Sequence, residues 1–294
     1  MTCPYVSAAG GGSRQAARAR RRMLSACAAA VLSTALAAGQ ARAADWIDDT
    51  LRGSYTTSAP VRWDGIHFGA TMGLSTMNAD YGSSTSSQVA YTLRNTTLEN
   101  EQHPSTWTTL PSNITNGRQF GAFLGYNMQW QELVVGFDLA YNKPSTLESS
   151  TSDTISRVVT LSDGTTDGVT IGARGSIKLI DYATARLRAG YAFGQFLPYA
   201  VVGVAVGRFN YSLSTDVTVA QTPSGGATTT FVFPTVTQTR SGIFSAGPLV
   251  GLGMDVAIVP NVFLRAEWEF AAFAPISGIR ATVNTGRVGV GMRF

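Results

Sequence analysis

Short stretches of the chain alternate apolar and polar residues with a period of two, a pattern typical of β-strands that present one apolar face. In residues 66–74, every second residue from Ile66 to Leu74 is apolar, and the residues between them are histidine, glycine or threonine. Residues 197–211 are apolar on both faces, so their register is not evident. With this segment included, the pattern predicts eight strands, at about 66–74, 119–128, 133–141, 186–193, 197–211, 250–256, 264–270 and 287–294.

Short and long connections alternate between these strands. Three connections are tight turns, at Trp130–Gln131, Gly194–Phe196 and Val259–Asn261. The others are rich in Ser, Thr, Asn and Gly, and they cover about 78–117, 144–175, 212–241 and, more briefly, 275–282. Outer-membrane barrels have short periplasmic turns, long outer loops and an even number of strands. The alternation of short and long connections, together with the even number of strands, therefore favours an eight-stranded antiparallel up-and-down transmembrane β-barrel with long extracellular loops.

The chemistry of the two strand faces separates a barrel from a soluble sandwich. A sandwich strand buries its apolar face, whereas a small membrane barrel turns that face to lipid and its polar face to the lumen. Here the polar face carries many glycines and charges of both signs, and unpaired charges in a narrow lumen would be costly. We therefore expect a lumenal ion network made of Asp138, Arg186, Arg188, Asp255, Arg265, Glu267, Glu269, Arg287 and Arg293.

Aromatic residues gather where the predicted strands meet the turns. Such positions suit an interfacial girdle, because an amphipathic ring fits at the level of the lipid headgroups. Ordinary core aromatics are the alternative interpretation. The expected girdle consists of Tyr126, Trp130, Tyr191, Phe193, Phe196, Tyr199 and Phe294.

The first 43 residues are basic and have the organisation of a secretory leader. The stretch RARRR precedes the apolar run 26–38, and the small-x-small triplet Ala41–Ala43 follows it, so Ala44 is the expected first mature residue. A membrane anchor helix would need about 20 apolar residues, and the run is shorter. A lipoprotein signal at Cys27 is disfavoured because that signal should follow the apolar run. We therefore divide the chain into a removed leader (1–43), a periplasmic tail (44–62) and a barrel (63–294).

Charge and cysteine content exclude several classes of protein. Six of the 22 basic residues lie in 1–43, whereas all 18 acidic residues lie after it. The mature chain therefore has 16 basic and 18 acidic residues and a net charge of −2. A nucleic-acid partner is therefore not expected. Both cysteines, Cys3 and Cys27, fall in the leader, which leaves no disulfide or thiolate zinc site.

Possible catalytic residues all have a more ordinary explanation. Glu267 and Glu269 are two residues apart on one strand face, a spacing that suits hydrolytic carboxylates, but we favour ion pairs with the arginines. His67 lies on the lumen face and His103 in a loop, and two histidines alone would make a weak metal site. Lipid A deacylase barrels have a His-x-Ser pair, whereas Gly69 follows His67 by two residues. We predict no enzyme, metal or cofactor.

Four segments resemble the small alphaproteobacterial outer-membrane barrels of the RopB group, within the OmpA-like transmembrane fold. They are RWDGIHFGATMGLS, RLRAGYAFGQFLPYAVVGVAVG, GLGMDVAIVPNVFLRAEWEF and the closing GRVGVGMRF. The resemblance covers the barrel, about 63–294, but not the long loops. Asp255 and Val256 stand where that family often has an aromatic, and Trp268 replaces a tyrosine.

The resemblance implies an abundant, porin-like protein that contributes to envelope integrity. It also implies that Phe294, as the terminal aromatic, is part of the signal read by the barrel-assembly machinery. Outer-membrane lipid and lipopolysaccharide are the remaining expected partners. Two alternatives stay open: a pore for small solutes, and an adhesion or receptor module that binds extracellular partners through the loops. An eight-stranded lumen is just filled by side chains, which disfavours the pore.

Overall fold

The computed structural model describes residues 61–294. The predicted leader, its cleavage site and nearly all of the predicted tail lie outside the described residues. No helix in the described part is long and apolar enough to cross a membrane.

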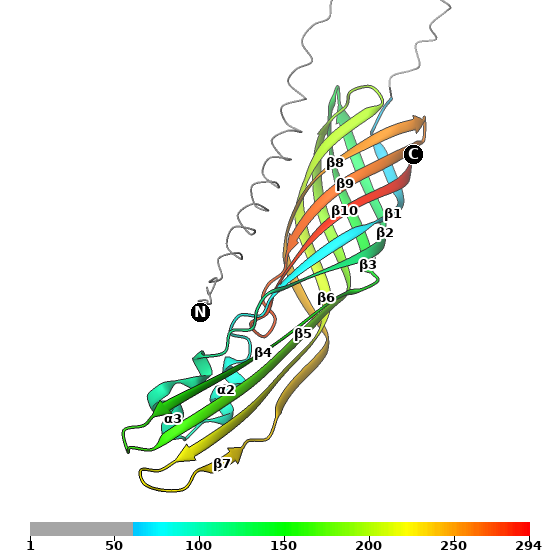
Figure 1. Ribbon diagram of the computed structural model, residues 1–294. Helices are drawn as coiled ribbons and strands as arrows, with labels where there is room; N and C mark the ends of the chain where they lie inside the picture. Colours follow the sequence, from blue (N-terminus) through cyan, green and yellow to red (C-terminus); the bar gives the residue numbers. More distant parts are fainter. Residues whose placement is uncertain (1–60) are drawn as a thin grey trace, which may run out of the picture. The chain divides into compact units, whose positions relative to one another are not determined.

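Eight strands close into an antiparallel barrel, as predicted (Figure 1). Each strand pairs with its neighbour in the chain, β1 pairs with β10, and β5 pairs with β6 to complete the ring. The barrel strands are β1 (Gly65–Asp80), β2 (Asn113–Trp130), β3 (Leu133–Pro144), β5 (Thr166–Tyr191), β6 (Phe196–Thr222), β8 (Val236–Val259), β9 (Val262–Ala272) and β10 (Arg280–Arg293).

The outer parts of β5, β6 and β8 continue past the barrel and form an additional sheet with β4 and β7. The outer half of β5 pairs with β4 (Leu147–Thr160) on one side and with the outer half of β6 on the other. The short β7 (Thr229–Val232) adds to β6. The connection between β1 and β2 contains the helices α2 (Ser86–Thr92) and α3 (Thr97–Gln102) and the 3-10 helix η1 (Pro104–Thr106). We call this sheet with its helices the extension.

The extension corrects the prediction for two of the long connections. Residues 144–175 and 212–241 were expected to be loops, but most of them are strand. Their high serine and threonine content suggested loops, although from Val169 to Leu179 every second residue is apolar or glycine, and the residues between them are Thr, Gly, Arg, Ser and Lys. From Leu213 to Val219 the same row is apolar except for Thr215. That alternation was the signal for a strand.

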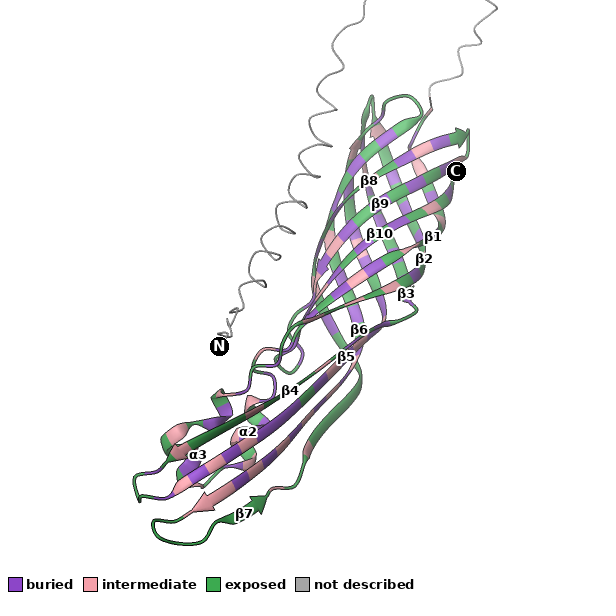
Figure 2. Cartoon of the chain, viewed as in Figure 1, coloured by how far each residue is buried: buried purple, intermediate pink, exposed green. Residues whose placement is uncertain are grey.

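Buried and exposed residues alternate along the strands of the barrel wall (Figure 2). Many of the exposed residues are large and apolar, whereas the buried ones include most of the charged residues of these strands. Outward residues such as Leu187, Val202 and Leu264 are half or more exposed, at 59%, 58% and 50%. The register of β6, which the pattern left open, places Leu197, Tyr199 and Val201 inside. An apolar outer surface around a closed barrel is stable in contact with lipid and unfavourable in contact with water.

The extension has the opposite arrangement and a small core of its own. Apolar residues on its inner face pack under α2, α3 and η1, and its outer face is rich in serine and threonine. The core residues are Val89, Leu93, Leu98, Leu161, Val169, Ile171, Val217 and Val219.

Candidate functional site

The barrel interior holds a layer of buried charges from five strands. They are balanced, with four carboxylates and four guanidinium groups, and each residue is at most 5% exposed. The structure brings together Asp138, Arg186, Arg188, Asp255, Arg265, Glu267, Glu269 and Arg287, which we call the lumen network.

Asp138 on β3 is the centre of the lumen network. Its Oδ2 lies 3.1 Å from Arg265 Nη1 and 3.3 Å from Arg186 Nη2, and Arg188 Nη1 is 3.8 Å away. Its Oδ1 lies 2.8 Å from His67 Nε2. One carboxylate therefore joins three arginines and the histidine that the sequence placed on the lumen face.

Asp255 forms the part of the network nearer the short turns. Arg265 donates to both of its oxygens, Nε to Oδ1 and Nη2 to Oδ2, at 2.9 Å each. Arg188 Nη2 donates to Oδ2 at 2.8 Å. A two-bond contact of a guanidinium with a carboxylate is a strong and geometrically specific ion pair. The guanidinium of Arg188 also lies 3.8 Å from the ring centre of Tyr199.

Glu267 and Glu269 form the part nearer the extension. Arg186 and Arg287 each contact both glutamates, with Arg186 Nη1 2.6 Å from Glu267 Oε1 and Arg287 Nη2 2.7 Å from Glu269 Oε1. Tyr199 donates its hydroxyl to Glu267 Oε2 at 2.8 Å. Each of the two carboxylates is therefore paired with two arginines.

Polar and aromatic side chains lie on both sides of the charges in the lumen. Toward the extension, Gln119 Oε1 accepts hydrogen bonds from Ser75 at 2.7 Å and from Tyr182 at 3.0 Å. Toward the short turns, the rings of Trp63 and Phe263 meet edge to face at 6.1 Å. These layers place further buried side chains on both sides of the charges.

Glycines on the inner wall make room for these large side chains. A Cβ added to Gly291 would overlap the ring of Phe263, and one added to Gly253 would overlap the ring of Tyr199. The sequence showed the glycines but not the rings that use their space. Phe123 and Phe263 were missed, although the rest of the Phe123 face is glycine and amide residues and the rest of the Phe263 face is charged.

Two predictions about individual residues were wrong. Tyr199 was expected in the outer girdle, but it is 5% exposed and points into the lumen, whereas the other six girdle aromatics are 46–68% exposed. Arg293 was expected in the ion network, but it makes no ion pair within residues 61–294. Its Nε and Nη2 donate to the Pro260 carbonyl at 2.9 and 2.6 Å, and its guanidinium lies 4.6 Å from the ring centre of Trp63.

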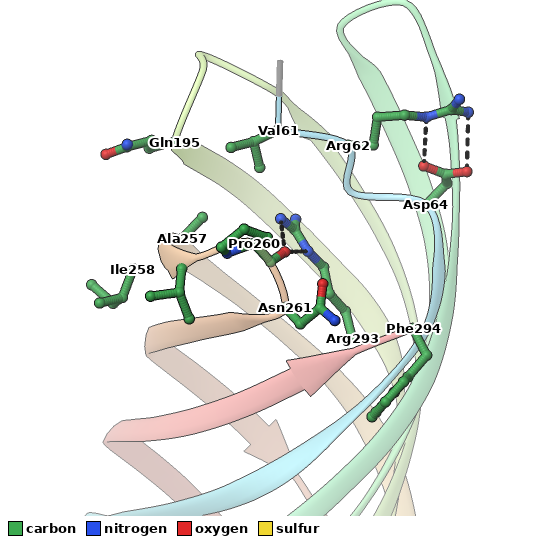
Figure 3. A pocket seen from close by; sticks show the side chains of 11 residues that line it. Val61, Arg62, Asp64, Gln195, Ala257, Ile258, Pro260, Asn261, Arg293 and Phe294 are labelled. Carbon is green, nitrogen blue, oxygen red and sulfur yellow. Dashed lines mark hydrogen bonds and ion pairs between the residues drawn. The ribbon is translucent and has the colours of Figure 1, made fainter. Parts of the chain in front are cut away.

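Arg293 lies at the barrel rim because it is the last residue of β10. It borders a pocket of about 550 Å³ at the end that carries the short turns, together with Val61, Asn261 and Phe294 (Figure 3). The exposed pair Arg62 and Asp64 also lines that pocket, with Arg62 Nε 3.0 Å from Asp64 Oδ1. The pocket and the lumen network are therefore separate features.

The two histidines lie in different surroundings. His67 bonds only Asp138, and His103 ends α3 with a positive φ of 48°. Within residues 61–294, no group of three or more His, Cys, Asp or Glu side chains is placed to hold a metal ion.

Comparison with known proteins identifies the family. No curated protein matches the chain. Among solved structures, the chain is similar to the attachment invasion locus protein Ail of Yersinia pestis (12% identity, 79% of this chain, 99% of that chain, TM-score 0.35). It is also similar to OprG of Pseudomonas aeruginosa (12%, 79%, 97%, 0.35) and to neisserial surface protein A (14%, 77%, 97%, 0.31). The model of the outer membrane protein beta-barrel domain matches residues 27–294, and the chain therefore belongs to that outer-membrane family.

Proposed function

We propose that this protein is a structural outer-membrane barrel that contributes to envelope integrity, with a lumen closed by ion pairs. The supporting observation is the lumen network, in which eight charges of balanced sign are buried and mutually paired. The resemblance to the RopB group of alphaproteobacterial barrels points the same way. A non-enzymatic role fits the carboxylates, because arginines hold both Glu267 and Glu269.

The variant E267A distinguishes a closed scaffold from a solute pore. In the closed barrel this change leaves Arg287 and Arg186 short of a buried partner, which typically costs about 3–5 kcal/mol. We expect the free energy of unfolding in urea to be lower for E267A than for the wild-type protein. We also expect the wild-type protein to show no conductance in planar bilayers. Unchanged stability together with altered conductance would establish the pore instead.

Export and assembly complete the proposal. The leader is removed after Ala43, and the barrel-assembly machinery reads the C-terminal strand through Phe294, which is 68% exposed. The outer face contacts outer-membrane lipid and lipopolysaccharide. Mass spectrometry of the mature N-terminus, with Ala44 as the expected first residue, tests the processing step.

A second candidate function is surface adhesion through the extension. The observation that favours it is that the extension is folded, with its own apolar core under α2, α3 and η1. Binding to intact cells, with and without removal of residues 147–165, would test this function separately from the barrel.

A further inference from the structure

The strand β4 has an unpaired edge that faces outward from the extension. It stands at the end of the strand order and pairs only with β5. No other described strand covers its far side from Thr151 to Thr160. Side chains along this edge are exposed, and Val158 is 75% exposed. An uncovered edge of this length is a template for pairing with another strand.

Two hydrogen bonds show which backbone groups point to the free edge. The Ser150 carbonyl accepts from Asn113 Nδ2 at 2.8 Å, and the Thr154 amide donates to Asp153 Oδ1 at 2.8 Å, so neither group is used toward β5. Because successive residues of a strand point their amide and carbonyl groups to opposite sides, the even-numbered residues 150–160 present theirs to the edge.

The charges on this edge are complementary to a second copy of the same strand. Asp153 and Arg157 lie two residues before and after Ile155 on one face, and neither makes an ion pair within the described residues. The guanidinium carbon of Arg157 lies 5.0 Å from the ring centre of Trp107, which packs against the core of the extension. When β4 meets an antiparallel copy with the two Ile155 residues opposite each other, each Asp153 faces an Arg157. The same register pairs Thr154 with Ser156, both of which present backbone groups to the edge.

We propose that the extension self-associates through this edge, by antiparallel pairing of two β4 strands about Ile155. Charged residues often protect edge strands from pairing. Here the two charges are opposite in sign and symmetric about one residue, so they attract an antiparallel copy. A parallel copy in register would place Asp153 against Asp153 and Arg157 against Arg157, which is destabilising.

The direction of β4 determines where the second copy lies. The chain leaves the short-turn end of the barrel along β3 and continues outward along β4. A barrel in the same membrane has its β4 pointing the same way, so only a parallel pair is available to it. An antiparallel partner therefore belongs to a facing membrane, and the pairing joins two cells. This inference rests on the proposed extracellular position of the extension.

Mixing of charge-reversed variants tests the pairing on whole cells with short lipopolysaccharide. Wild-type cells should clump, whereas cells with D153R alone or R157D alone should clump about tenfold less, because like charges then face each other at two positions. A mixture of D153R cells and R157D cells should clump like wild type, since each charge again meets its opposite. R174D, on the outer face of the neighbouring strand, is the matched control and should clump normally. Dispersed wild-type cells, or no recovery in the mixture, would overturn the proposal.

A cross-link locates the partner. In a C3S/C27S background, I155C places one thiol on the expected symmetry axis, where opposite Cβ atoms are about 4.5–5.5 Å apart. Two cell populations with different epitope tags, mixed and then oxidised, should give a dimer that carries both tags. Dimers that form only when both tagged chains are made in one cell would contradict pairing between cells. Labelling of the extension on intact cells reports its extracellular position separately, so a failure of the orientation is distinguishable from a failure of the pairing.

Discussion

The two halves of β5 have opposite chemistry on what is one continuous strand. In the barrel half, Arg186 and Arg188 point inward and Leu187 points outward, whereas in the outer half Ile171 and Ile177 point inward and Thr170 points outward. The inner side of the barrel continues as the inner side of the extension. The exchange of polar and apolar faces therefore follows the change of surroundings, from lipid around the barrel to water around the extension.

A bulge and an ion pair mark the place where the faces exchange. The pairing of β5 with β6 shifts between Leu179 and Asp181, so inward residues are odd-numbered before the shift and even-numbered after it. On the outer surface at this level, Arg208 contacts Asp181, which also accepts from the Tyr141 hydroxyl at 3.0 Å. Charged groups on the outside of the wall fit the end of the lipid zone.

The largest expected difference between the halves concerns removal of one cation from β5. R186A removes one of the two buried arginines that contact Glu267 and Glu269, and we expect it to lower the free energy of unfolding by about 3–5 kcal/mol. K178A breaks a pair with Glu148 whose side chains are 45% and 56% exposed, so its effect should be below about 1 kcal/mol. Urea unfolding in detergent or lipid measures both, and equal losses would contradict the distinction.

The second largest expected difference between the two halves of β5 is the effect on stability of a charge introduced on the outer face. L187R places a guanidinium in the middle of the lipid-facing row of β5, which costs about 2–4 kcal/mol at the bilayer midplane. T170R makes the same change on the outer face of the extension, where water solvates the charge, and should be close to neutral. Heat-modifiable migration and urea unfolding test this pair. A neutral L187R would mean that this face does not contact lipid.

The smallest expected effect is on the pH dependence of stability, and it follows from a comparison of two buried aspartates, one in the barrel and one in the extension. Asp138 is paired with three arginines, whereas Asp167 in the extension is 2% exposed and its Oδ1 has no hydrogen-bond partner in the described structure. Burial, and secondarily the nearby Asp163, raise the pKa of Asp167 above its ordinary 3.8, against a hydrogen bond with Gln221.

The sign of the pH dependence follows from that shift. The folded extension holds the Asp167 proton more tightly than the unfolded chain does, so the stability of the extension should fall as the pH rises from about 3.8 through the raised pKa. D167N should remove this dependence and protect the extension at neutral pH. Limited proteolysis of the extension across this pH range measures it, and identical profiles for both proteins would refute the assignment to Asp167.

The alternating pattern determined the eight barrel strands, the lipid-facing rows and the inward position of the charges. These features follow from period two and from the rule that charges avoid lipid, both of which are local properties of a strand. His67 was placed inside on the same basis. The strands of the extension show a similar alternation, but their high serine and threonine content is also typical of loops.

The height of each inward side chain along the barrel axis and the residues that it contacts were decided only by the tertiary structure. Arg287 and Arg293 share one strand face, but the register sets Arg287 beside Glu267 and leaves Arg293 at the rim, where the Pro260 carbonyl is its partner. The inward position of Tyr199 depends on the phase of β6 against β5 and β8, which an apolar run does not reveal. Likewise, the unpaired edge of β4 exists because β3 ends at Pro144 and its continuation has only β5 beside it. A sequence fixes which face a residue occupies, whereas closure of the sheet through non-local pairing fixes its height and its neighbours.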